Sequence, residues 1–292
     1  MRVLFVRPKM PSTIEKEEPL GVLYILSYIK ANIKDAEVDF IDAHETREDP
    51  EQVYEQIKFI NYDVVAITVL TIGAAFAYKL ARLINNSKPK MTAKIIFGGA
   101  HSSALPQECL ENGADYCIIG EGEISTCQLL NYLSEGKDIS PLKGIAYLGS
   151  DKQMVIAPRQ ELITNLSELD FPDYSILKGT NYNTTIHLDT GNKALPIMAS
   201  RGCANDCPFC CSKLMWNRKL RYRSVQNVVD EIERDYNVYD VKEYHFYDDD
   251  FLVNRAFIRE FGREILRRGL EIKFCCLSTC KSFLNLESDD II

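Results

Sequence analysis

Short apolar runs rich in β-branched residues recur through the first 120 residues, and stretches of helical length separate them. Polar or glycine-containing segments bound each run, which is typical of buried strands. The regular alternation of strand and helix predicts a fold of the α/β class with a doubly wound parallel sheet. The predicted strands are 2–6, 37–41, 63–69, 94–97 and 116–119, and the predicted helices are 20–29, 50–60, 74–86, 105–112 and 123–134.

Glycine-containing loops follow the third, fourth and fifth predicted strands. Ligands of doubly wound sheets bind beyond the carboxyl ends of the strands, and glycine lets the backbone approach a bulky or phosphorylated ligand. Each loop would also serve as an ordinary turn between strand and helix. No G-x-G-x-x-G follows the first strand, which disfavours a nicotinamide dinucleotide. The loops read Leu70-Thr71-Ile72-Gly73, Gly98-Gly99-Ala100-His101 and Gly120-Glu121-Gly122-Glu123.

A change of pattern divides the chain after this sheet. Residues 144–148 and 154–156 alternate around a polar turn and predict a small hairpin within a linker. Apolar strand patterns return at 195–199 and 243–247, with helical patterns after Ser224 and over 255–268. The predicted organisation is therefore a first domain over 1–140, a linker over 141–195 and a second domain over 196–292.

Three cysteines lie in the loop that leaves the apolar run 195–199. Cys203, Cys207 and Cys210 have C-x3-C-x2-C spacing, and Cys211 follows directly. Thiolates of one short loop reach a common soft metal centre, and three of them suit a four-iron cluster whose fourth iron takes another ligand. A zinc knuckle and inert buried thiols are the alternatives, although zinc prefers four protein ligands in structural sites.

Composition and charge narrow the choice of function. Apolar residues make up 46% of the 292-residue chain and charged residues 26%, as in ordinary globular domains. A formal net charge of −8 disfavours nucleic acid as a partner. No signal peptide and no apolar run of about 20 residues is visible, so we expect a cytoplasmic protein without a membrane partner. Ten cysteines are then metal ligands or reduced core residues, and we predict core packing for Cys275 and Cys276.

The cysteine loop resembles that of the radical SAM superfamily. Cys203, Cys207 and Cys210 match the three cluster cysteines of the family, and Phe209 matches the aromatic position before the last of them. The resemblance implies a [4Fe-4S] cluster whose fourth iron chelates the amino and carboxylate groups of S-adenosylmethionine (SAM). One electron, from a donor such as flavodoxin or ferredoxin, would then cleave SAM to a 5′-deoxyadenosyl radical.

Residues 1 to about 140 resemble the cobalamin-binding domain that precedes the catalytic domain in one large class of radical SAM enzymes. Pro19-Leu20-Gly21 and the glycine loops at 98–101 and 120–123 carry this resemblance. The D-x-H-x-x-G motif is absent after the first strand, so we expect no protein histidine below the cobalt, and we predict His44 to be a surface loop residue. The implied cobalamin contacts are Thr71, Gly98, Gly99, His101, Gly120, Glu121 and Gly122.

The predicted strand 243–247 ends in Asp248, Asp249 and Asp250. In the radical SAM superfamily this strand end meets the methionine part of SAM, so the resemblance implies that the three aspartates bind the cofactor. A carboxylate suits the methionine ammonium through charge-assisted hydrogen bonding. The same residues would also form a solvated turn that caps the following helix. For His245, inside the strand, we predict core packing.

Residues 196–292 supply three strands, whereas the barrel of the family has six strand–helix units. We therefore expect the N-terminal half of a barrel, with a last strand that a partner chain or a second copy would cover. A fragment, a natural truncation and half of a split enzyme all remain open.

The resemblance implies a cobalamin-dependent radical SAM enzyme that acts on a small-molecule or peptide substrate. It would abstract hydrogen from an unreactive carbon and deliver a methyl group from methylcobalamin. Two alternatives remain: an anaerobic oxidative cyclase of a tetrapyrrole with the same cofactors, and a non-catalytic corrinoid or cluster carrier. A tRNA-modifying enzyme is disfavoured because no basic accessory domain is visible.

Overall fold

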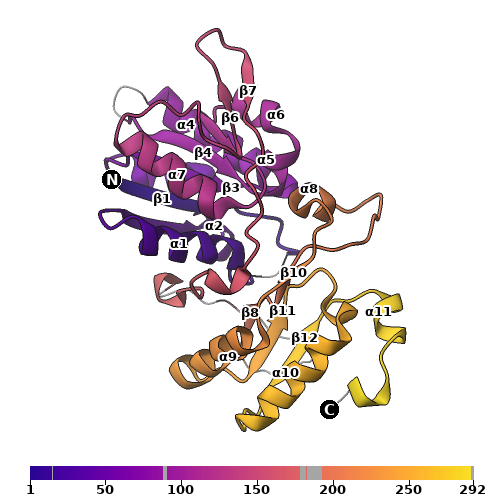
Figure 1. The fold of residues 1–292 in the computed structure, drawn as a ribbon. Coiled ribbons are helices and arrows are strands. Elements are labelled where there is room, and N and C mark those ends of the chain that lie inside the picture. Colours follow the sequence, from indigo (N-terminus) through magenta and orange to yellow (C-terminus); the bar gives the residue numbers. More distant parts are fainter. Residues whose placement is uncertain (15, 88–90, 178–181, 183–192, 291–292) are drawn as a thin grey trace. The chain divides into compact units, whose positions relative to one another are not determined.

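The computed structural model describes residues 1–14, 16–87, 91–177, 182 and 193–290 (Figure 1). The chain forms two compact units. Unit 1 comprises Met1–Ile14, Gly21–Leu162 and Pro172–Asn181, and unit 2 comprises Glu15–Leu20, Ile163–Phe171 and Tyr182–Ile292. None of the helices in the described part of the chain is long and apolar enough to cross a membrane.

Unit 1 contains a seven-stranded sheet with the order β2-β1-β3-β4-β5-β6-β7. The first five strands pair in parallel, and β6 and β7 form an antiparallel hairpin at one edge. The predicted parallel sheet is thereby confirmed. The hairpin, predicted within a linker over 141–195, instead pairs with β5 and continues this sheet. The strands are β1 (Arg2–Arg7), β2 (Glu37–Asp42), β3 (Val64–Thr68), β4 (Lys94–Gly98), β5 (Tyr116–Ile118), β6 (Ile145–Leu148) and β7 (Met154–Ile156).

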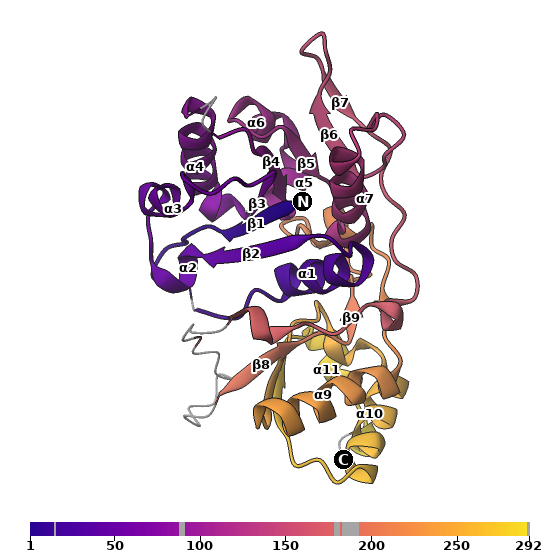
Figure 2. The same ribbon diagram turned by 90° about the vertical axis from the view of Figure 1, so that its left-hand side faces the viewer.

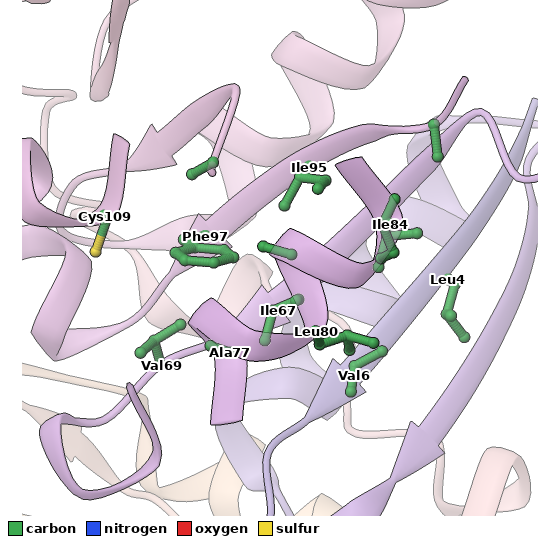
Figure 3. Close-up of a cluster of buried hydrophobic side chains, with 14 of the residues drawn as sticks. Leu4, Val6, Ile67, Val69, Ala77, Leu80, Ile84, Ile95, Phe97 and Cys109 are labelled. Atoms are coloured by element: carbon green, nitrogen blue, oxygen red, sulfur yellow. The ribbon is translucent and has the colours of Figure 1, made fainter. Parts of the chain in front are cut away.

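Helices cover both faces of this sheet (Figure 2). Successive strand side chains point to opposite faces, so the strands feed two cores. Val6, Ile67 and Phe97 pack with α4 on one face (Figure 3), and Phe5 and Ile118 pack with α1 and α7 on the other. The elements are α1 (Leu20–Asn32), α2 (Ala43–Thr46), α3 (Pro50–Ile57), η1 (Thr71–Gly73), α4 (Ala74–Asn86), α5 (Ala100–Ala104), α6 (Pro106–Glu111), α7 (Gly122–Ser134) and η3 (Tyr174–Leu177).

Unit 2 contains three parallel strands in the order β12-β11-β8, joined by helical connections. This βαβαβ arrangement matches the predicted half-barrel. A short antiparallel ribbon of β9 and β10 stands beside the cysteine loop. The elements are η2 (Leu166–Glu168), β8 (Ala194–Ile197), β9 (Ser200–Arg201), α8 (Ser212–Trp216), β10 (Arg221–Tyr222), α9 (Val225–Tyr239), β11 (Glu243–Phe246), η4 (Phe251–Val253), α10 (Arg255–Arg267), β12 (Lys273–Cys276), α11 (Cys280–Leu284) and η5 (Ser288–Asp290).

An aromatic cluster fixes α10 against the three-stranded sheet. Phe246 of β11 contacts Phe261 of α10 edge to face, with ring centroids 5.6 Å apart, and Phe274 of β12 contacts both. Such aromatic pairs add about 0.5–1.5 kcal/mol each beyond the area they bury. His245 points to the opposite face of β11 and is 6% exposed, so its predicted burial is confirmed.

Candidate functional site

The three cysteines of the C-x3-C-x2-C motif lie in an irregular loop between β9 and α8. Cys203, Cys207 and Cys210 are half-buried free thiols, whereas Cys211 is exposed. The Cys203 sulfur accepts a hydrogen bond from Asn205 Nδ2 at 3.3 Å, and the Cys210 sulfur accepts one from the Ser212 N–H at 3.4 Å. N–H groups directed at sulfur stabilise thiolates as metal ligands.

Gly202, just before the cysteine loop, has a backbone conformation that residues with a side chain rarely adopt. Its φ is 94°, and a Cβ placed there would overlap the carbonyl oxygen of Lys219 and lie 3.0 Å from Trp216 Cβ. The chain that enters the cysteine loop therefore passes directly beneath the chain that enters β10. Only glycine fits this crossing.

The donor set fits an iron–sulfur cluster better than zinc. Across 1–14, 16–87, 91–177, 182 and 193–290, no three His, Cys, Asp or Glu side chains converge as metal ligands. The three motif thiols are therefore not gathered around one point in this part of the chain, and the comparison rests on ligand number, since structural zinc sites use four protein ligands. The loop does supply three partly exposed thiols outside any disulfide, which is the protein ligand set of a cluster with one open iron. Phe209 is 89% exposed beside them.

The three aspartates after β11 occupy different environments. Asp248 is 1% exposed, and its carboxylate accepts hydrogen bonds from the Ala199 N–H at 3.0 Å and Ser200 Oγ at 2.5 Å. Asp249 is exposed and accepts a hydrogen bond from Ser212 Oγ at 2.8 Å.

Asp250 is 2% exposed and links β11 to the loop after β12. Its carboxylate accepts hydrogen bonds from the Thr279 N–H and Thr279 Oγ1, both at 3.1 Å, from Ser282 Oγ at 2.9 Å and from Ser278 Oγ. The oxygens of Asp248 and Asp250 are thus engaged inside the protein.

Burial raises the pKa of Asp248 to about 6 from an ordinary value of 3.8, although hydrogen bonds from Ser200 and Ala199 act in the opposite direction. Stability from protonated Asp248 is fully present below pH 3.8 and is lost as the pH rises through about 6. We therefore expect the unfolding free energy of wild type, minus that of Asp248→Asn, to fall by roughly 2–3 kcal/mol between pH 4 and 7. Denaturant titration of iron-free protein measures it, and a difference that stays constant with pH would contradict the assignment.

A cavity of about 350 Å³ opens beside the cysteine loop within unit 2. The third strand, β12, contributes much of its wall through the loop that follows it, a region that the sequence patterns did not single out. The position of these residues just after a strand of a parallel sheet could have predicted a role in the site, because such loops gather at one edge of the sheet. The lining residues are Cys203, Ala204, Asn205, Leu220, Asp250, Leu252, Val253, Arg255, Thr279, Lys281, Ser282 and Asn285.

Among the residues that the structure describes, the cavity lining has one cation without an ion-pair partner. Arg255 pairs with Glu287 at 2.6 Å and with Asp290 at 2.7 Å. Lys281 is exposed and makes no ion pair with any described residue. Lys281 therefore supplies an accessible positive charge at the cavity, which suits an anionic group, while the Asp250 carboxylate is 2% exposed.

The residues predicted to bind cobalamin follow β3, β4 and β5 of unit 1, at the carboxyl edge of the sheet. Thr71 is exposed in η1, Gly98 is the last residue of β4, and Gly99 follows it. Gly99 has φ 99°, and a Cβ there would lie 3.0 Å from Val69 O, so the β3 and β4 loops approach each other closely. The structure brings the predicted glycine loops to one edge.

His101 is buried between these loops. It is 3% exposed, with Nδ1 3.1 Å from Thr71 Oγ1 and Nε2 2.7 Å from the Tyr78 hydroxyl. Both ring nitrogens therefore have protein partners. Ser103, which the sequence patterns missed, links the next pair of loops: its Oγ donates to Gly99 O at 2.9 Å and accepts from the Gly120 N–H at 3.0 Å.

Two further predicted residues lie at the start of α7, where Glu121 is buried and Gly122 is half-buried. Glu121 is 6% exposed and precedes the helix as its N-cap residue. At Gly122, an added Cβ would lie 2.7 Å from Ile25 Cδ1 of α1. The absence of a side chain at Gly122 thus serves close helix packing.

The prediction of His44 as a surface residue was wrong. His44 is fully buried in α2, and its Nδ1 accepts a hydrogen bond from the Met10 N–H at 3.2 Å. Arg47 donates to Met10 O at 3.1 Å from the same turn. His44 is buried because it fastens the loop after β1 to the end of β2.

Comparisons with known proteins match a family to each of the two domains. The family profile for the B12 binding domain matches residues 15–130, and that for the Radical SAM superfamily matches residues 197–292. The chain therefore has a B12-binding domain over residues 15–130 followed by a radical SAM domain over residues 197–292.

Curated relatives span the length of the chain. An uncharacterized methyltransferase of Pyrococcus horikoshii is 28% identical over 97% of this chain and 61% of its own length. The anaerobic magnesium-protoporphyrin IX monomethyl ester cyclase of Rubrivivax gelatinosus is 29% identical over 93% of this chain and 49% of its own length. The chain thus spans about half to three-fifths of these relatives.

Solved structures share the fold. The cobalamin-dependent SAM radical enzyme OxsB, solved with aqua-cobalamin bound, aligns with a TM-score of 0.77 and 20% identity, over 94% of this chain and 38% of its own. The radical SAM methyltransferase TsrM from Kitasatospora setae aligns with a TM-score of 0.70 and 19% identity, over 91% and 51%. Both likenesses concern the fold.

Proposed function

We propose that this chain is the cofactor-binding part of a cobalamin-dependent radical SAM enzyme that transfers a methyl group to an unactivated carbon. The observation that carries the proposal is the loop of Cys203, Cys207 and Cys210 directly after the first strand of a βαβ unit, downstream of a B12-binding domain. When bound, the [4Fe-4S] cluster supplies the electron that cleaves SAM to a 5′-deoxyadenosyl radical, and methylcobalamin supplies the methyl group.

The cavity beside Cys203 is the proposed SAM site. Cys203, Thr279, Lys281 and Asn285 are among its lining residues. The amino-acid end of SAM carries a carboxylate, which suits the unpaired Lys281. Phe209, exposed at the last cluster cysteine, remains a proposed contact of the bound cofactor.

Replacing Lys281 by methionine should weaken SAM binding by roughly tenfold, because a charge-assisted hydrogen bond to the carboxylate is lost. Decarboxylated SAM lacks that group, so we expect wild type and the variant to bind it equally. Equilibrium binding to the reconstituted protein measures both ligands. Lys273→Met, at an exposed lysine in the same unit, is the control. Equal losses for the two ligands would show that Lys281 does not contact the carboxylate.

The loops at the carboxyl edge of the unit 1 sheet are the proposed cobalamin site. Leu70 and Ile72 expose 47% and 52% of their area on either side of Thr71, an apolar surface suited to a macrocycle. Gly98, Gly99 and Gly120 would allow close backbone approach. Within this proposal, His101, Glu121 and Gly122 position the loops rather than contact the corrinoid. His101 is hydrogen-bonded to Thr71 and Tyr78, and Glu121 and Gly122 start α7.

The partners follow from the chemistry. A small-molecule or peptide substrate would supply the unreactive carbon, and flavodoxin or ferredoxin would supply the electron.

We place the enzyme in the cytoplasm, because its ten cysteines include no disulfide among the described residues, as expected in a reducing compartment. A partner chain or a second copy remains proposed as the cover of β12, whose Phe274 is 40% exposed.

The second candidate function is oxidative cyclisation of a tetrapyrrole. Several cyclases of magnesium-protoporphyrin IX monomethyl ester are similar to the chain along almost its entire length, one of them 30% identical over 94% of it. Cofactor binding would be the same for both candidates. Product analysis with candidate substrates separates methylation from cyclisation.

Anaerobic reconstitution with iron, sulfide and cobalamin tests the proposed function. Absorption and electron paramagnetic resonance spectra of the desalted protein should show both a four-iron cluster and a bound corrinoid, and addition of SAM with a reductant should yield 5′-deoxyadenosine. Corrinoid binding without the cluster would favour a corrinoid carrier. Retention of neither cofactor would overturn the proposal.

A further inference from the structure

The consecutive residues Asp248 and Asp249 hold the two ends of the cysteine loop. Asp248 bonds to Ala199 and Ser200, just before the loop, and Asp249 bonds to Ser212, just after it. Adjacent Cα atoms lie about 3.8 Å apart, so both ends of the loop are tied to one point at the end of β11. All three motif cysteines lie between these ties.

The hydrogen bonds of Asp248 to Ala199 and Ser200 form the first tie. They are buried, and Arg223 holds the residue just before them. The Met198 carbonyl oxygen accepts a hydrogen bond from Arg223 Nη1 at 2.9 Å, while the next two residues bond to Asp248. Arg223 is 4% exposed and pairs with the fully buried Glu231 at 2.5 Å. Buried charges held in this way fix the turn strongly, because removing one partner leaves the other without compensation.

The second tie is a single hydrogen bond between side chains. Ser212 is 7% exposed and is the first residue of α8, and its Oγ donates to Asp249 Oδ2. Its N–H donates to the sulfur of Cys210. Ser212 therefore connects Asp249 to the last cysteine of the motif.

We infer that Asp248 and Asp249 are positioning residues that set the span of the cysteine loop, and that they act through Ala199, Ser200 and Ser212 rather than by contacting SAM. This inference rests on the proposed function for the identity of the metal centre. It departs from the role in SAM binding implied by the family resemblance. Closing the loop in advance lowers the entropy lost when three thiols gather around one cluster.

Asp249→Ala, Ser212→Ala and the double variant test the inference. Each single change should raise the rate of iron release to a chelator roughly fivefold without SAM, the expected effect of losing about one hydrogen bond. The double variant should release iron no faster than either single one, because both changes break the same link. Asp230 is an exposed acid of α9 that pairs with Arg268, and Asp230→Asn controls for the loss of a negative charge.

Hydrogen exchange of the iron-free protein provides a second readout that needs no cluster. Amides of residues 203–211 should exchange faster in Asp249→Ala and Ser212→Ala than in wild type, and to the same extent in both. This measurement tests the inference even if wild type takes up no cluster, a result that would overturn the proposed function alone.

A different pattern would overturn the inference and leave the proposed function standing. If Asp249 contacts SAM, Asp249→Ala will weaken SAM binding while Ser212→Ala binds SAM as wild type does. Iron release and hydrogen exchange will then match wild type in both variants.

Discussion

Replacement of Cys203 by alanine should abolish both the four-iron cluster and the formation of 5′-deoxyadenosine. Cys203 is one of only three thiols in the proposed ligand set, and among the described residues no group of three or more His, Cys, Asp or Glu side chains offers an alternative site. A cluster held by two thiolates would lose iron during desalting. Iron and sulfide analysis, electron paramagnetic resonance and product chromatography measure the result.

The neighbouring Cys211 provides the matched control. It lies in the same loop, is exposed, and falls outside the C-x3-C-x2-C spacing. Cys211→Ala should keep the iron content and the 5′-deoxyadenosine yield of wild type. SAM cleavage that survives in Cys203→Ala would remove the basis for the proposed function.

The sequence predicted the sheet of unit 1 well because its signal is local. Each strand is a short apolar run, and burial on both faces of a parallel sheet requires that pattern. The helix predicted over 105–112 corresponds to α6, Pro106–Glu111, whereas α5, Ala100–Ala104, was not predicted. Proline at the first helical position starts a new helix, which the hydrophobic period does not reveal.

The surroundings of the candidate site could not be predicted in the same way. The spacing of Cys203, Cys207 and Cys210 placed the loop correctly, because one short segment supplies all three. The environment of Asp248 depends on Ala199 and Ser200, 49 and 48 positions earlier. His44 likewise became buried through Met10, which lies in another loop. Contacts of this range leave no periodic signal in the sequence.

Lys281 illustrates what the sequence patterns omit. Nothing around it suggests a ligand, since it lies in the first turn of a short helix after an ordinary strand. Its importance arises by comparison with Arg255, which is already ion-paired, and with Asp250, whose oxygens already accept hydrogen bonds. Only a structure shows which charged side chains remain without a partner, and this difference distinguishes a binding residue from a surface lysine.

Replacement of Gly202 by alanine should prevent cluster binding while leaving the two units folded. The substitution has two costs. A φ of 94° strains any residue with a side chain, by about 1–3 kcal/mol. The added methyl group would also overlap the Lys219 carbonyl oxygen, so the chain before Cys203 must move. Because that chain delivers the first cysteine, we expect loss of most of the bound iron.

Gly269→Ala separates the two costs. Gly269 lies in the same unit with φ 66°, and an added Cβ would meet no atom within 4 Å. This variant should therefore lose about 1 kcal/mol of unfolding free energy and keep its cluster. Circular dichroism and denaturant titration monitor folding, and iron analysis monitors the site. If Gly202→Ala binds iron as Gly269→Ala does, the crossing beneath Lys219 does not set the position of Cys203, and the cluster tolerates a displaced loop.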